Sequence, residues 1–159
     1  MAIRPAFLQA WQRFSEINID VSSVGKKIGG NVGANIMLGE QDPSQGFTNA
    51  CAIRMSYTLN YSGARVERGV WKTVSGDDKN WYIYRVKDLL TYMHKKYGKP
   101  DKIVKNPTPG DFQNLKGILV FAVNGWSDAS GHATLWNGSV CSDHCYFPIS
   151  NEGSIWLLK

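Results

Sequence analysis

The lone cysteine of the segment GFTNACAIRMSYTLN (46–60) has a position that suits covalent chemistry. Cys51 falls at the start of a predicted helix. The dipole and the free N–H groups of a helix N-terminus favour the thiolate form of a cysteine, and the thiolate is the nucleophile. The same N–H groups are able to bind the oxyanion that forms on an attacked carbonyl. Cys51 is therefore a candidate nucleophile for acyl transfer.

A packing role is the alternative for Cys51, because free cysteine is one of the residue types most often buried. The helix has a predicted core face with i, i+3, i+7 spacing. Its members are Ala50, Ile53 and Tyr57. Cys51 is not among them, so we expect it in the first turn, beside the core face. Thr48 or Asn49 is expected to cap this turn.

His132 is the candidate base for this thiol. It follows Gly131 at the start of HATLW (132–136), a predicted strand after the loop NGWSDAS (124–130). Asp143 comes after the predicted turn Asn137-Gly138, and a carboxylate there is able to bind the far nitrogen of the imidazole and fix its tautomer. A strand-end histidine bonded to solvent is the alternative.

The other two cysteines, Cys141 and Cys145, flank Asp143 in VCSDHCYF (140–147). A close pair plus one remaining cysteine suggests a disulfide and a free thiol. An oxidised pair would indicate that the protein works outside the reducing cytosol. Zinc bound by Cys141, His144 and Cys145 is the rival interpretation. Three ligands so close in sequence do not easily surround a tetrahedral ion, and a second ligand pair is missing.

Composition limits the function classes. The chain has 159 residues, a net charge of +5 and a pI near 9.1, which suit an anionic partner. Its basic residues are scattered, and no nucleic-acid motif is present. The longest apolar run, Ile118–Val123, is too short to span a bilayer. The N-terminal segment MAIRPAFLQAWQRF lacks the apolar core of a secretory signal.

The hydrophobic pattern predicts one domain, 1–159, of the α+β class, with helices first and an antiparallel sheet after them. Helices are expected at about Pro5–Asn18 and from about residue 50, and WYIYRVKDLLTYMHKKYG (81–98) is expected to form a short strand and then a helix that ends at Gly98. Further strands are expected at GILVFAV, at HATLW with an alternating pattern, and at IWLLK. The glycine-rich segment 24–47 and residues 62–80 are expected to be loops. The GGNVG at 29–33 suggests a phosphate cradle, but neither a buried strand before it nor a Lys-Ser/Thr after it supports one.

Three motifs, NACAIRMSYTLN, SGHATLWNG and CSDHCY, occur in this order. Together they resemble the family-4 amidase effectors of bacterial type VI secretion systems, which are small papain-like cysteine peptidases related to NlpC-type hydrolases. The similarity covers most of the chain and includes IGGNVGANI (28–36). It implies a papain-like fold with the nucleophile helix packed on an antiparallel sheet. It also implies Cys51 as nucleophile, His132 as base, Asp143 as orienting acid and a Cys141–Cys145 disulfide.

The resemblance further implies a substrate and a route. The substrate would be the stem peptide of peptidoglycan, cut between D-glutamate and meso-diaminopimelate through a thioester, without cofactor or metal. The protein would be injected into the periplasm of a rival bacterium, without a signal peptide, and a cognate immunity protein would block its active site. Neither nucleic acid nor membrane insertion is implied. A wall-binding module without turnover and an acyltransferase with the same thiol are the alternatives.

Overall fold

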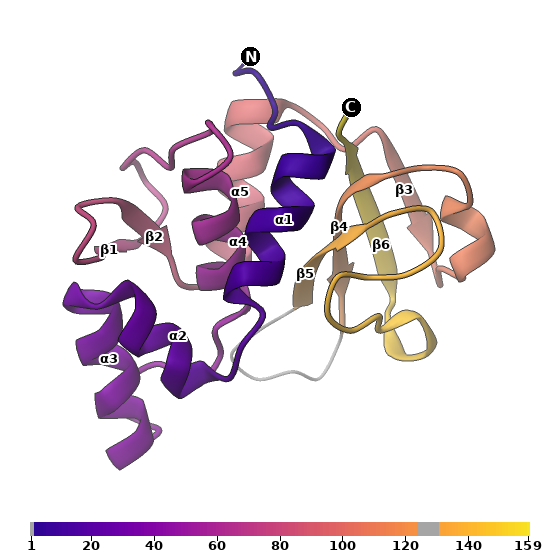
Figure 1. Ribbon diagram of the computed structural model, residues 1–159. Helices are drawn as coiled ribbons and strands as arrows, with labels where there is room; N and C mark the ends of the chain where they lie inside the picture. Colours follow the sequence, from indigo (N-terminus) through magenta and orange to yellow (C-terminus); the bar gives the residue numbers. More distant parts are fainter. Residues whose placement is uncertain (1, 124–130) are drawn as a thin grey trace.

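The computed structural model describes residues 2–123 and 131–159, so the loop predicted at 124–130 lies outside the described residues. Figure 1 shows the helices gathered on one side of the molecule and the main sheet on the other. The helices are α1 (Phe7–Ile17), α2 (Val21–Ile28), α3 (Gly30–Gln41), α4 (Cys51–Asn60) and α5 (Val86–Tyr97), with short 3₁₀ turns at Pro109–Phe112 and Phe147–Ile149. The strands are β1 (Thr73–Ser75), β2 (Trp81–Ile83), β3 (Lys102–Lys105), β4 (Gly117–Ala122), β5 (Gly131–Trp136) and β6 (Glu152–Leu157).

The main sheet has the strand order β3-β6-β4-β5, and all of its pairs are antiparallel. The α+β class is therefore confirmed, as are the three strands that the sequence predicts. Although β5 lies at the sheet edge, all six of its residues are buried. Helices α1, α4 and α5 cover its face with Ala133 and Leu135, and the cluster of Phe112 and Phe147 covers Trp136 on the other face. The alternating burial expected for HATLW is wrong for this reason.

Helix α4 lies at the centre of the molecule and is buried around almost its whole circumference. Ala50, Ile53 and Tyr57 contact the cluster formed with α2 and α3, as the sequence predicts. The opposite face, which includes Cys51, belongs to the cluster formed with α1, α5 and the sheet. Cys51 is only 3% exposed, so the expectation that it lies outside the core is wrong. A helix covered on both faces has no single core stripe.

The segment 24–47, predicted to be a loop, forms instead most of α2 and all of α3, two helices that pack against each other. Asp20 caps α2, because its carboxylate accepts a hydrogen bond from the N–H of Ser23 at 3.0 Å. Gly29 has a φ of +67° and forms the sharp junction between the two helices. The buried residues of the pair recur every fourth position, which is a helical period. They are Val24, Ile28, Val32 and Ile36.

Glycine is required in this helical pair for close approach. A Cβ atom on Gly33 would lie 2.8 Å from the carbonyl oxygen of Gly25 on the facing helix. A Cβ atom on Gly39 would overlap the backbone of Phe47, in the segment that leads to α4. Glycines that indicate a loop in the sequence are therefore packing positions in two helices.

The segment 81–98 forms β2 and α5 as predicted, and α5 ends at Gly98, whose φ is +81°. His94 is exposed on this helix. The sequence interpretation missed two short strands, β1 within 62–80 and the exposed edge strand β3. Among the described residues, no helix has the length and apolar character needed to cross a membrane.

Substitution Gly39→Ala tests the packing role of this glycine. Alanine favours a helix interior by about 1 kcal/mol, but overlap with a rigid backbone costs about 1–3 kcal/mol. We expect the free energy of unfolding to fall by about 1–2 kcal/mol, measured by urea denaturation. Gly110→Ala is the matched control, because the nearest atom to its added Cβ lies 3.9 Å away. Equal stabilities of the two variants would contradict the account.

Candidate active site

Cys51 is the first residue of α4, at the end of the loop that follows α3. Its thiol contacts the sheet: the backbone N–H of Ala133 on β5 donates a hydrogen bond to Sγ at 3.0 Å. The N-cap position is Ala50, and the side-chain oxygen of Asn49 accepts a hydrogen bond from the N–H of Cys51 at 2.8 Å. The prediction of Thr48 or Asn49 as the N-cap is therefore wrong, because Ala50 occupies that position without a side-chain hydrogen bond and Asn49 lies one residue before it. The nucleophile candidate is fixed by contacts at both its backbone and its sulfur.

His132 and Asp143 are brought together by the turn that follows β5. The Nε2 atom of His132 lies 3.1 Å from Oδ1 and 2.9 Å from Oδ2 of Asp143. Both side chains are at least nine-tenths buried. Because Nε2 faces the carboxylate, Nδ1 is the imidazole nitrogen left for proton exchange with the thiol. The structure thus places the three residues singled out in the sequence at one site.

The orientation of Asp143 depends on groups that the sequence interpretation missed. Thr134 donates a hydrogen bond from Oγ1 to Oδ1 of Asp143 at 2.6 Å. Ser142 lies 3.0 Å from the same threonine oxygen and accepts a hydrogen bond from the N–H of Leu135 at 3.1 Å. The signal for Thr134 was present, because residues i and i+2 of a strand share a face and Thr134 follows His132 by two.

The disulfide between Cys141 and Cys145 is present, as expected. It closes a small ring that contains Asp143, and Cys141 pairs with Trp136 at the end of β5 through an isolated bridge. The ring therefore restricts the backbone on both sides of the carboxylate, next to the strand that carries His132.

The electrostatics of the three residues are coupled. Burial opposes protonation of His132, but the charge of Cys51 and the hydrogen bond to Asp143 outweigh it and raise the pKa of His132 to about 10. Burial also works to raise the pKa of Asp143, but the hydrogen bond and charge of His132 hold that pKa below its usual range. At neutral pH, this favours an imidazolium bound to the carboxylate of Asp143.

These residues line an open groove of about 440 Å³. The ring of Tyr146 packs edge-on against that of His132, with centroids 4.8 Å apart, and forms one wall. Arg54, one turn after Cys51, and Asn18, at the end of α1, contribute to the lining. Within the described residues, no cluster of His, Cys, Asp and Glu is arranged to hold a metal ion.

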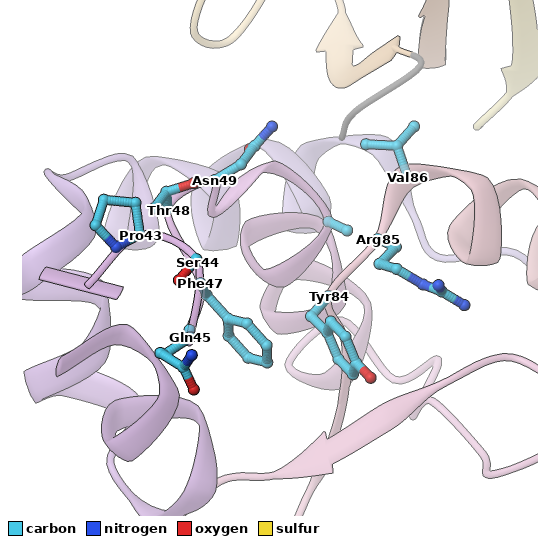
Figure 2. A pocket seen from close by; sticks show the side chains of 11 residues that line it. Pro43, Ser44, Gln45, Phe47, Thr48, Asn49, Tyr84, Arg85 and Val86 are labelled. Atoms are coloured by element: carbon cyan, nitrogen blue, oxygen red, sulfur yellow. The ribbon is translucent and has the colours of Figure 1, made fainter. Parts of the chain in front are cut away.

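A second cavity of about 280 Å³ adjoins the groove and shares Thr48 and Asn49 with it. Figure 2 shows this cavity between the loop that leads to α4 and the start of α5, with the rings of Phe47 and Tyr84 side by side. These rings stack with centroids 4.5 Å apart. The second cavity contains none of the three candidate catalytic residues, so it extends the site without being its chemical centre.

Residues 47–158 match the family described as type VI secretion system (T6SS), amidase effector protein 4, or Tae4. The chain is also similar to Tae4 in the Tae4–Tai4 effector–immunity complex from Salmonella Typhimurium (47% identity over 99% of this chain and 100% of that one, TM-score 0.90). Tae4 from Enterobacter cloacae is 46% identical over the whole of both chains, with a TM-score of 0.91. No curated protein sequence matches the chain.

The raised pKa of His132 has a measurable consequence. A histidine whose pKa is higher in the folded chain stabilises the fold below about pH 6.5, and that contribution is lost as pH rises through about 10. We expect the imidazole NMR signals of His132 to remain those of the protonated ring at pH 8. Asp143→Asn should lower the titration midpoint, because it removes the anion that binds Nε2. A wild-type midpoint near 6.5, or one that Asp143→Asn leaves unchanged, would contradict this electrostatic account.

Proposed function

This chain belongs to the Tae4 family of type VI secretion amidase effectors, and from that premise we propose its substrate, mechanism and residues. The substrate is the stem peptide of peptidoglycan in a rival bacterium. The bond hydrolysed is the amide between the γ-carboxyl of D-glutamate and meso-diaminopimelate. Cys51 is the nucleophile, His132 the acid–base group and Asp143 the residue that orients the imidazole. The enzyme is thus a cysteine peptidase that acts as one domain over residues 1–159.

The observation that carries this proposal is the arrangement of the three side chains in one groove. Nε2 of His132 lies 2.9 Å from Asp143, and the thiol of Cys51 is near enough to raise the pKa of the same imidazole. A thiolate–imidazolium pair places a nucleophile and a proton donor next to each other before the substrate binds. A protein that only binds the cell wall would not require this pair.

In the first half-reaction, the thiolate of Cys51 attacks the carbonyl carbon of the D-glutamyl residue, and the carbonyl oxygen takes the negative charge. The tetrahedral intermediate collapses when the C–N bond breaks, and the leaving amine of diaminopimelate takes the proton of His132. The product of this step is a thioester between Cys51 and the γ-carboxyl group. Neutral imidazole remains, still hydrogen-bonded to Asp143 and ready to act as a base.

In the second half-reaction, neutral His132 removes a proton from water, and the resulting hydroxide attacks the thioester carbonyl. The C–S bond breaks, the sulfur leaves as a thiolate, and the free carboxyl group of D-glutamate is released. His132 then holds the proton again, so the thiolate–imidazolium pair is restored. The net reaction consumes one water and yields one carboxylate and one amine.

The oxyanion of both half-reactions forms next to the N-terminus of α4. The N–H of Cys51 points to this region, and in the free protein it donates to the side-chain oxygen of Asn49. A negatively charged oxygen is a stronger acceptor than a neutral amide oxygen. We therefore infer that the oxyanion displaces Asn49 and that this N–H stabilises the transition state more than the bound substrate.

The partner and the compartment follow from the same premise. The Salmonella and Enterobacter relatives form complexes with the immunity protein Tai4. We propose that a cognate immunity protein binds over the groove of this chain and closes it to peptidoglycan. Action in the periplasm of the target cell agrees with the disulfide at Cys141 and Cys145, since such bonds persist in oxidising compartments.

Digestion of purified sacculi, followed by mass spectrometry of the muropeptides, tests the proposal. We expect the wild-type protein to release fragments with a new free amine on diaminopimelate and to leave L-Ala–D-Glu on the muramic acid. Cys51→Ala and His132→Ala should each reduce the rate by roughly 10⁴-fold or more, because the members of such a unit fail together. His94→Ala is the matched control, because His94 is an exposed histidine on α5, outside the groove, and it should remain active.

Other products would contradict the proposal in recognisable ways. Glycan strands stripped of all peptide would indicate cleavage of the sugar–peptide amide. A peptide transferred to an added amine in place of water would indicate an acyltransferase. Undigested sacculi with a correctly folded wild-type protein would indicate a binding module.

A further inference from the structure

Arg54 is the residue of α4 that is not buried, and it lies one turn after Cys51 in the lining of the same groove. Its guanidinium donates a hydrogen bond from Nη2 to the carbonyl oxygen of Ile19 at 2.7 Å. Its Nε atom is buried and has no hydrogen-bond partner among the described residues. No ion pair with a described carboxylate involves Arg54, whereas Arg4, Arg13 and Arg85 each have one.

A partly desolvated guanidinium without a counter-charge is an unfavourable arrangement, because buried donors and charges cost free energy unless they are paired. Among the described residues that line the groove, Asp143 is the acidic one, and it is already bound to His132 and Thr134. The tether to Ile19 fixes the guanidinium in place, which reduces the ordering entropy lost when a ligand binds. Among the described residues, Arg54 is therefore a fixed cation of the groove without a carboxylate partner of its own, close to the nucleophile.

We propose that Arg54 binds a carboxylate of the substrate that flanks the scissile amide. The inference rests on the proposed function and adds a determinant of specificity to it. D-glutamate joined through its γ-carboxyl keeps a free α-carboxylate a few bonds from the attacked carbonyl. Diaminopimelate also carries a carboxylate, on the other side of the bond. Guanidinium–carboxylate pairs are strong and directional, so either group fits the residue.

The spacing along α4 supports this assignment. The backbones of Cys51 and Arg54 are about 4.5 Å apart along the helix axis, and both residues line the same groove. A peptide attacked at its γ-carbonyl by Cys51 therefore brings a charged group of the same residue within reach of Arg54. A neutral amide in place of that carboxylate would leave the guanidinium unpaired.

Matched synthetic stem peptides test the inference. One has the free D-glutamate α-carboxylate, the second has this group amidated, and the third has the diaminopimelate carboxylate amidated. We expect kcat/KM of the wild type to fall about 10- to 100-fold on amidation of the carboxylate that Arg54 binds. Arg54→Gln should lose a similar factor on the free acid and no longer discriminate, whereas Arg54→Lys should keep part of the preference. The peptide to which the wild type responds identifies the carboxylate.

Arg13→Gln is the matched control, because Arg13 also has a buried Nε without a partner but is paired with Glu16 and does not line the groove. It should discriminate among the peptides as the wild type does. Thermal melting of each variant separates loss of ligand binding from loss of fold. The inference is overturned if Arg54→Gln is folded and keeps the wild-type ratios among the three peptides.

A second readout does not depend on turnover. Iodoacetate and iodoacetamide alkylate the same thiol, but only iodoacetate is an anion. Arg54→Gln should lower the ratio of the iodoacetate rate to the iodoacetamide rate several-fold at Cys51, and Arg13→Gln should leave it unchanged. An unchanged ratio in Arg54→Gln overturns the inference. If the wild-type protein shows the expected ratio of iodoacetate to iodoacetamide rates and yet cleaves none of the peptides, the proposed function fails. In that case the anion-binding role of Arg54 remains.

Discussion

The contact between the start of α4 and strand β5 is the constraint on which the site depends. The N–H of Ala133 donates to the sulfur of Cys51 at 3.0 Å, and the neighbouring residue on the strand is His132. One hydrogen bond therefore fixes the distance between the helix that carries the thiol and the strand that carries the imidazole. All six residues of β5 are buried, and α1, α4 and α5 pack against the strand, which keeps that contact rigid. A protein interior of this kind has few alternative packings.

The remaining parts of the site are attached to this contact. Asp143 is reached from the end of β5 by a short chain segment that the Cys141–Cys145 disulfide restricts, and Thr134 on the strand binds the carboxylate directly. The result is a buried imidazole held by the carboxylate of Asp143 in the groove that also contains the thiol, with a guanidinium in the same lining. Charged groups that are fixed in this way are able to stabilise the charges that form during acyl transfer.

The sequence predicted α1, α5, the nucleophile helix and the sheet strands β4, β5 and β6, because their hydrophobic periods are strong and local. The prediction failed for segment 24–47, because glycine by itself favours loops but here permits close packing of two helices. The apolar residues from Val24 to Ile36 recur every fourth position, and this spacing indicates a helix. The three candidate catalytic residues could be named from motifs, and the structure brings them together. Asn49 was expected only as a cap. The burial of Cys51 depends on tertiary contacts that no local pattern encodes. The same is true of Arg54, which has no carboxylate partner among the described residues.

The central claim is that Cys51 forms a covalent bond with the acyl half of the stem peptide. Acid quenching during turnover, followed by mass spectrometry of the digested protein, measures this directly. We predict that the peptide containing Cys51 gains the mass of the L-Ala–D-Glu acyl fragment and that hydroxylamine removes the added mass, as expected for a thioester. Steady turnover with no such adduct at Cys51, or with the adduct on another residue, would contradict the account.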